Sequence, residues 1–413
     1  MHNDLSWPVV GPLNPATKRV VYGVLDTVAR SHELTAKHLE RLESSYQATS
    51  DAIAASPELG DDVTEIHAQG SRALGTSVRP IGKHGFDIDS ISHLRAGARA
   101  KYSGDGGAER LLQAHFTVLK RHGDRHGLKV RRKTRCIQIE YTAELHADIT
   151  PFFEDPCPGL RWGEHHGVVP DRELRSYCAS NPVGYRKWFD TAAAIRPNLA
   201  MRVIVAKSLA AEGVDVVPLP AADEVFPRFL CRLVQVAKIH RNTLFANAPE
   251  LAPTSIFITT LIATAYSNLA LVQHGDELDL MLNIVKAMAS SFQRRWLPDG
   301  QEEWVLLNPT THNENVASRM NTPERQSAFR QWLAKFFEDL FLLASSAARA
   351  EGGDQRLVLV ESAFGAQAAR HLRTETMALV QARRASSWAA AAVPTGQGLV
   401  LPSRSHTFHG SQS

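Results

Sequence analysis

The chain has 413 residues, of which 44 % are hydrophobic and 22 % are charged, as in an ordinary globular protein. Its 46 lysines and arginines nearly balance its 43 aspartates and glutamates, so the net charge of +3 excludes a protein that bulk charge alone holds to nucleic acid. The 26 glycines and 21 prolines exclude a collagen-like or mostly disordered chain, and the length predicts two to three domains or subdomains.

Neither export nor membrane anchoring is indicated. The four cysteines contain no Cys-x-x-Cys pair, which argues against a disulfide framework. The first residues lack the basic start and apolar run of a secretory signal. The most apolar long stretch, 256–272, carries too many Thr, Ser and Asn residues to span a membrane. We therefore expect a cytoplasmic protein with no membrane association.

The first half of the chain is predicted to be a helical segment followed by strands. Apolar residues recur at helical spacing over 16–56 with one interruption, and a short helix or strand is expected at 63–68. Residues 86–91 alternate in period two, which indicates a strand. A helix at 108–121 precedes further strands at 129–133, 136–141 and 144–149.

The second half is predicted to be mainly helical. Residues 151–182 are rich in Pro, Gly and His and indicate a long loop region, and a polar break is expected at 297–322. Helices are expected at 184–210, 224–245, 253–272, 277–294, 323–350 and 365–391. The order of helix, strands and helices predicts a mixed α+β fold.

Three aspartates carry the chemistry that the sequence indicates. Asp87 and Asp89 lie two residues apart on one strand and therefore share a face, and Asp148 lies on a later strand. A pair of carboxylates on one face is unfavourable unless a cation lies between them, and hard divalent cations prefer oxygen ligands. A third carboxylate would complete a site for two metal ions, which serves phosphoryl or nucleotidyl transfer. An isolated Asp-x-Asp is more often a solvated strand edge.

A Gly-Ser pair upstream strengthens the metal-site interpretation. Gly70 and Ser71 stand at a turn before a helix, where backbone N–H groups and a hydroxyl can contact a phosphate. Gly-Ser alone is common and usually serves only to cap a helix. Gly-Ser, then a same-face aspartate pair, then a lone aspartate on a later strand is a far more specific pattern.

The combined pattern resembles the nucleotidyltransferase fold of the polymerase-beta type. Within that fold, the strings QGSRALGTSVRP, FDIDSI and ELHADITPFF are similar to the bacterial cyclic-oligonucleotide synthases of anti-phage systems, relatives of cyclic GMP-AMP synthase and oligoadenylate synthase. The similarity continues in RFLCRLVQVAKIHRN, PTSIFITTLIATAY and LLNPTTHNENVASRM and spans about 61–335. It implies a catalytic core with N-terminal helices at 1–215, a helical subdomain like that of oligoadenylate synthase at 216–393, and a flexible tail at 394–413.

The resemblance also implies an activity and a role for each site residue. Two Mg²⁺ ions, with Mn²⁺ as a substitute, would be held by Asp87, Asp89 and Asp148. The donor nucleoside triphosphate would be contacted by Gly70, Ser71, Lys238 and Ser255. Without the family, Lys238 is better interpreted as an ordinary helix lysine and Ser255 as a first-turn residue. The product would be a cyclic di- or trinucleotide second messenger that acts on an effector encoded nearby.

Three further features have competing interpretations. Eight cations lie in 120–135, and a solvated turn is favoured there over a nucleic-acid site, so no obligatory nucleic acid is expected. Cys157, His165, His166 and Cys178 have none of the standard zinc spacings, which makes a zinc site the less favoured reading. Some relatives are joined through their C-terminus to other molecules, and the tail at 394–413 is a candidate for such conjugation or has no role.

Two other functions remain open at this level. The same three aspartates would serve a nucleotidyltransferase that modifies an RNA end, a small molecule or a protein. A binding protein with a dead site is the third alternative, and the presence of all three aspartates argues against it.

Overall fold

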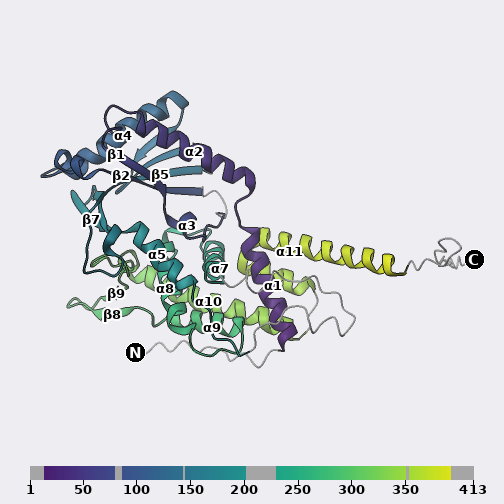
Figure 1. Cartoon of the computed structure of the whole chain (residues 1–413). Coiled ribbons are helices and arrows are strands. Elements are labelled where there is room, and N and C mark those ends of the chain that lie inside the picture. Colours follow the sequence, from purple (N-terminus) through teal and green to yellow (C-terminus); the bar gives the residue numbers. More distant parts are fainter. Residues whose placement is uncertain (1–13, 80–85, 143–144, 201–228, 350–352, 392–413) are drawn as a thin grey trace, which may run out of the picture.

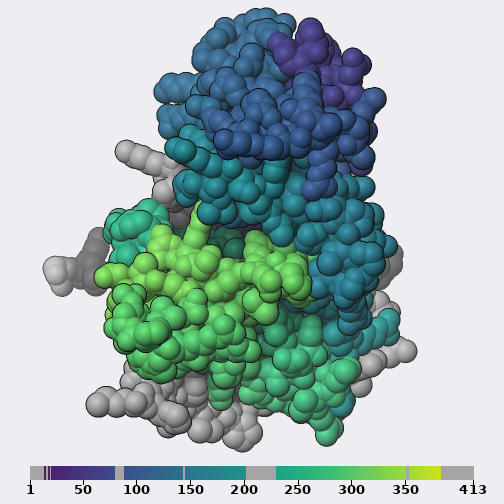
Figure 2. Space-filling model, turned by 90° about the vertical axis from the view of Figure 1, so that its left-hand side faces the viewer, coloured from purple at the N-terminus to yellow at the C-terminus, as the bar shows by residue number. Residues whose placement is uncertain are grey.

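The structure is a computed structural model of the whole chain, and it describes residues 14–79, 86–142, 145–200, 229–349 and 353–391. The predicted tail at 394–413 and the predicted domain boundary between 215 and 216 lie outside the described residues. The chain forms a half built on a β-sheet and a half built of helices (Figure 1). Figure 2 shows the blue and teal residues of the sheet half stacked on the green residues of the helical half.

In the sheet half, seven described strands form one sheet. Five of them follow the order β1-β2-β5-β4-β3, while β6 pairs with β5 and β7 pairs with β6. β2 and β5 run parallel at its centre, and the other pairs are antiparallel. The strands are β1 (Val63–Ala68), β2 (Phe86–Leu94), β3 (Lys129–Arg132), β4 (Ile137–Thr142), β5 (Leu145–Glu154), β6 (Gly167–Asp171) and β7 (Ser176–Ser180). The helices are α2 (Ala36–Ala54), α3 (Gly70–Ala73), η1 (Ala96–Tyr102), α4 (Gly107–His126) and η2 (Gly163–His165).

One face of this sheet is apolar, and it packs against α2 and α4. Ile88 of β2, Ala147 of β5 and Ile139 of β4 are buried in one cluster with Leu42 of α2 and Leu112 of α4. Side chains alternate between the two faces along a strand, so the residues next to these in sequence point away from α2 and α4. The face that carries the aspartates is therefore turned away from α2 and α4.

The helical half has the larger buried core. Its elements are α1 (Pro15–Ser31), α5 (Pro182–Ala193), α7 (Phe229–Leu244), η5 (Pro249–Leu251), α8 (Ser255–Leu269), α9 (Glu277–Met288), β8 (Gln293–Trp296), β9 (Glu302–Val305), η6 (Ser318–Met320), α10 (Pro323–Ala348) and α11 (Gly353–Ala391). One hydrophobic cluster joins α1, α5 and α7 to α11. α1 thus packs in the helical half, although the sequence division placed the N-terminal helices with the catalytic part.

The interruption predicted within 16–56 is where the chain passes from one half to the other. α1 ends at Ser31, and Thr35 caps α2 by accepting a hydrogen bond from the His38 backbone N–H. Because α1 and α2 belong to different cores, this short connection crosses between the halves.

Three expectations about the elements were wrong. Residues 151–182 were expected to be a loop, but β5 runs to Glu154, and β6 and β7 follow. A Cβ on Gly167 would lie 2.2 Å from the Phe152 ring, so this glycine marks close packing of strands rather than a loop. The antiparallel hairpin of β8 and β9 lies partly in the expected break at 297–322. The helix expected at 184–210 ends at Ala193. The helix expected from 365 is the second part of α11, because Gly365 has a non-helical φ of 85° and ψ of 165°, and a further helical part begins at Gly353.

No helix among the described residues is long and apolar enough to cross a membrane. The apolar stretch at 256–272 forms α8, whose Phe257, Ile258 and Leu261 are completely buried in the helical core. All four cysteines are free thiols.

Candidate active site

Asp89 and Asp148 lie side by side on the central pair of strands. β2 and β5 run parallel, with Asp89 directly opposite Asp148 in the register. Residues in register on neighbouring strands point to the same face, so both carboxylates project from the side away from α2 and α4. Asp87 lies opposite His146 in the same register. Its side chain lies outside the described part of the structure.

The negative charge of this pair acts on a nearby thiol. The pKa of Cys136 is raised by burial first and then by the charges of Asp148 and Asp89. Two adjacent carboxylates that repel one another and offer only oxygen atoms suit a hard divalent cation. Among the described side chains, which do not include that of Asp87, no three metal-binding groups gather at one point.

The Gly-Ser turn is packed directly on Asp89. The Gln69 backbone N–H donates to the Asp89 carbonyl at 2.8 Å, which ties the end of β1 to β2. Gly70 has φ +66°, and a Cβ placed on it would lie 2.2 Å from Asp89 Oδ2. Only glycine combines this backbone conformation with so close an approach to the carboxylate. The glycine is therefore required by the position of Asp89 and not only by the turn.

Gly70→Ala should lower the activity of this site by at least about 10-fold, because the methyl group must displace the Asp89 carboxylate. The matched control is Gly104→Ala, since Gly104 has φ +70° but open space around its missing Cβ. Both variants should lose about 1 kcal/mol of stability from the left-handed backbone. Steady-state turnover with thermal unfolding separates the two effects, and equal activity in the two variants would contradict the clash with Asp89.

Lys238 of α7 reaches the segment that follows the Gly-Ser turn. Its Nζ donates to the Thr76 carbonyl at 3.2 Å and the Thr76 hydroxyl at 3.1 Å, and the residue is 3 % exposed. The Thr76 backbone N–H in turn donates to the Ser71 carbonyl at 2.9 Å. Desolvation, and then the positive charge of Arg241, lower the pKa of Lys238 to about 7, while Asp89 opposes the fall. An amine with this pKa changes charge near neutral pH.

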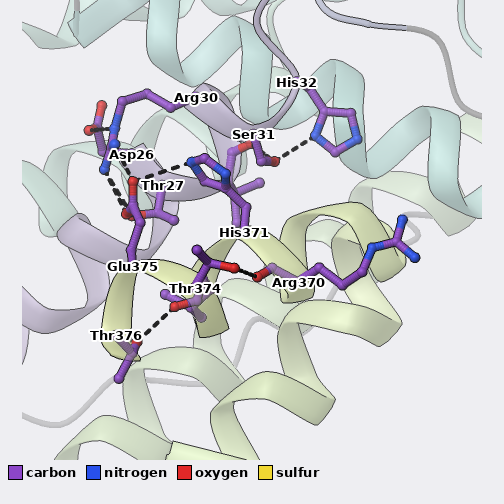
Figure 3. A network of polar contacts seen from close by, with 12 residues as sticks. Asp26, Thr27, Arg30, Ser31, His32, Arg370, His371, Thr374, Glu375 and Thr376 are labelled. Carbon is purple, nitrogen blue, oxygen red and sulfur yellow. Dashed lines mark hydrogen bonds and ion pairs between the residues drawn. The ribbon is translucent and has the colours of Figure 1, made fainter. Parts of the chain in front are cut away.

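The same segment is anchored to the helical half at its other end. The Arg79 guanidinium donates to the Ser31 carbonyl at 2.7 Å, and the Arg79 backbone N–H donates to the His32 carbonyl at 2.7 Å. Figure 3 shows that this end of α1 is bound in turn by α11. There Glu375 accepts hydrogen bonds from Arg30, and from the Thr27 hydroxyl at 2.8 Å. An unbroken run of contacts thus leads from α11 to the Lys238 amine.

Ser255 opens α8 and is held by Arg241, three residues beyond Lys238 on the same face of α7. The Arg241 guanidinium donates to Ser255 Oγ at 3.3 Å, to the Pro253 carbonyl at 2.6 Å and to Asn242 Oδ1 at 2.8 Å. These acceptors are neutral, and burial lowers the pKa of Arg241 to about 10. Lys238 is buried and Arg241 is half-buried, and among the described residues no carboxylate is bonded to either cation, which favours an anionic ligand.

A cavity of about 550 Å³ joins these residues. Its walls include Gly70, Ser71 and Asp89 from the sheet half and Lys238, Arg241 and Ser255 from the helical half. Five predicted site residues therefore line one cavity, and Asp148 stands next to Asp89 on the sheet. Sequence reasoning missed Thr76, Arg241 and Glu314 as wall residues. The helical spacing of Lys238 and Arg241 was the one signal that could have found Arg241.

The structure separates the other candidate residues. His166 Nδ1 lies 3.0 Å from the Asp155 carbonyl, and Cys178 Sγ donates to the Val169 carbonyl, so these side chains serve local contacts. No metal-binding group forms from them within the described residues. Five of the eight cations in the basic run are bonded to carboxylates, and these are Lys120, Arg121, Arg131, Arg132 and Arg135.

Comparison with a family model decides the identity of the catalytic half. Residues 23–192 match the Second Messenger Oligonucleotide or Dinucleotide Synthetase domain, SMODS. Residues 23–192 are a SMODS domain. The chain is a nucleotidyltransferase, as its motifs predicted.

Relatives of this SMODS protein match over most of its length. It is 25 % identical over 352 residues to a c-di-GMP synthase of Roseivirga ehrenbergii, and the match covers 83 % of each chain. The structure of CdnG, a CD-NTase of Bradyrhizobium diazoefficiens in complex with GTP, matches with a TM-score of 0.56 at 17 % identity, over 86 % of this chain and 98 % of that one. CdnC of E. coli MS115-1, in its HORMA-deltaN complex, matches with a TM-score of 0.55 at 15 % identity, over 85 % and 99 %. The two structures establish the shared fold, which confirms the expected α+β class.

Proposed function

We propose that this SMODS protein joins nucleoside triphosphates into a cyclic di- or trinucleotide for anti-phage defence signalling. The observation that supports the proposal is the single cavity that Asp89 shares with Lys238, Arg241 and Ser255. The Asp89 carboxylate on one wall, with Asp148 beside it on the sheet, suits divalent cations, and the two cations Lys238 and Arg241 on the other wall suit a triphosphate. The name of the Roseivirga relative makes GTP the first nucleotide to test.

In the proposed reaction a ribose hydroxyl of one nucleotide attacks the α-phosphorus of another. The bond between the α-phosphorus and the bridging oxygen breaks, pyrophosphate leaves, and Asp148 takes the hydroxyl proton. Gly70, Ser71, Lys238 and Ser255 hold the triphosphate. A second transfer closes the ring.

Asp87, Asp89 and Asp148 would hold two Mg²⁺ ions, or Mn²⁺ in their place, and bound metal would supply charge stabilisation for the entering and leaving oxygens. The chain's own residues position the triphosphate and stabilise the leaving pyrophosphate. Ser71 and Thr76 fix the segment beneath the triphosphate, because the Thr76 N–H donates to the Ser71 carbonyl at 2.9 Å. Lys238, once protonated, stabilises the charge on the leaving pyrophosphate.

The product would act on an effector encoded nearby. We also propose that the tail at 394–413, outside the described residues, is the point at which a conjugation partner would be joined.

The test is to incubate the full-length chain with Mg²⁺ or Mn²⁺ and all four ribonucleoside triphosphates, labelled at the α-phosphate. The expected result is a small phosphatase-resistant product whose mass identifies a cyclic oligonucleotide, with one pyrophosphate released per bond formed. Label on RNA, a protein or another small molecule would favour the alternative nucleotidyltransferase. Absence of product, with candidate activators added, would overturn the proposal.

A further inference from the structure

The cavity wall carries a further carboxylate, that of Glu314. Neither metal binding nor phosphate binding explains its presence there. It lines the same cavity as Lys238 and Arg241, together with Asn308 and Asn181. Glu314 is half-buried, and within the described residues it forms no ion pair. A carboxylate in a cavity for an anionic substrate is costly unless part of that substrate donates hydrogen bonds to it.

The segment 308–314 holds this carboxylate in a defined place. The Asn308 side-chain amide donates to Glu314 Oε2 at 2.7 Å, and its backbone N–H donates to the Glu314 carbonyl at 2.8 Å. The buried Asn181 side chain caps α5 and donates to the Thr310 carbonyl at 2.8 Å. The wall is therefore fixed to the start of α5, and such fixed positions suit a site that must present one hydrogen-bonding edge.

Lys238 and Arg241 line the cavity from α7, whereas Glu314 lines it from the segment 308–314. The charge of Asp89 acts to raise the pKa of Lys238. The charge of Glu314 instead acts to raise the pKa values of Tyr185 and Arg135. Arg135 is already bonded to Asp171 at 2.8 Å, so it does not neutralise Glu314 directly. Phosphates are attracted to the wall of Lys238 and Arg241 and repelled from Glu314. The wall around Glu314 thus suits a nucleobase rather than a phosphate.

The chemistry of a carboxylate selects among the four bases. An ionised carboxylate only accepts hydrogen bonds, and both of its oxygens can accept more than one. Guanine presents two adjacent donors, N1–H and the 2-amino group, which match the two oxygens in a bidentate pair. Adenine and cytosine place an acceptor nitrogen beside their amino group, and uracil has one N–H between two carbonyl oxygens. Each of these would set a lone pair against the carboxylate.

We propose that Glu314 binds the N1–H and 2-amino edge of a guanine and makes GTP a substrate of this enzyme. The inference rests on the proposed function, in which the cavity holds a nucleoside triphosphate. Glu314 is then a specificity-determining residue, and its partner Asn308 is a positioning residue.

The experiment compares GTP, ITP and ATP with the full-length chain, because inosine keeps N1–H and lacks only the 2-amino group. We expect kcat/KM for GTP to exceed that for ITP by on the order of 10-fold and that for ATP by more. Glu314→Gln should bring GTP and ITP within about 3-fold of one another, because the amide replaces one acceptor by a donor. Glu303→Gln on β9, outside the cavity wall, is the matched control and should keep the original ratios.

A purely structural role for Glu314 would lower the turnover of all three nucleotides equally and leave their ratios unchanged, and this result would overturn the proposal. So would a wild-type preference for ATP or a pyrimidine nucleotide. Calorimetric binding of GTP and ITP separates the two proposals. Glu314-dependent discrimination in binding without any cyclic product would refute the function alone, and a cyclic product without guanine would refute the specificity alone.

Discussion

Replacing Asp89 or Asp148 by asparagine should lower nucleotidyl transfer by on the order of 10³-fold while leaving the protein folded. The two carboxylates lie in register on the central parallel strands, and both are required if they hold cations at the reacting phosphate. Asparagine keeps the shape of the side chain. It also removes one of two like charges on neighbouring strands, so the free energy of unfolding should stay unchanged or rise.

The measurement is the initial rate of pyrophosphate release, together with denaturant unfolding of each variant. Asp124→Asn is the control, because Asp124 lies on α4 and its side chain is 61 % exposed. Its activity should match that of the wild type. A loss of less than about 10-fold in either active-site variant would contradict a metal-holding role for that residue.

Lys238→Met should weaken triphosphate binding by about 10- to 100-fold, because a hydrogen-bonded charge in a buried site is lost. Binding should also be coupled to a proton. The pKa of Lys238 is lowered to about 7 in the free enzyme, chiefly by desolvation, and a bound polyanion raises it again. At pH 8, therefore, each triphosphate should bring close to one proton into the wild-type protein.

Calorimetry in buffers with different ionisation enthalpies measures this proton uptake. Lys238→Met should abolish it, and Lys37→Met, at an exposed position on α2, should not. Proton uptake that persists in Lys238→Met would assign the titration to another group.

The same lysine predicts a pH dependence of stability in the free enzyme. Its pKa is about 7 in the folded state and about 10.4 in the unfolded state, so between these values the unfolded chain binds more protons. The stability of the wild type relative to Lys238→Met should therefore rise from pH 7 to pH 10, by roughly 4 kcal/mol over the whole window. A difference between the two proteins that does not change with pH would show that Lys238 is not desolvated as the structure has it.

Much of the catalytic half was predictable because its signals are local. The alternation over 86–91 led to β2, and the Gly-Ser pair marked the start of α3. The hairpin of β6 and β7 was missed because Pro, Gly and His suggested a loop, whereas Gly167 is there to let Phe152 approach. The strand β8 was missed because all four of its residues are exposed and carry no apolar alternation.

The helical half shows a different limit. The helix expected from Gly365 is present, but the helical part of α11 that begins at Gly353 was not predicted, and Gly365, with φ 85°, separates the two parts. Arg241 and Glu314 carry no motif of their own. Their roles depend on what surrounds them, namely neutral acceptors around Arg241 and a bonded Asn308 beside Glu314.

The aspartates and the Gly-Ser turn predicted a two-metal site for phosphoryl or nucleotidyl transfer, because such motifs are short and depend on local spacing, and their resemblance to the polymerase-beta type of fold implied a nucleotidyltransferase. Three facts depended on the tertiary structure. These are the register that sets Asp89 against Asp148, the burial that moves the pKa of Lys238 to about 7, and the wall that brings Glu314 into the cavity. Each arises from contacts between segments far apart in the chain, and local spacing carries no information about the strand register or the desolvation that such contacts produce.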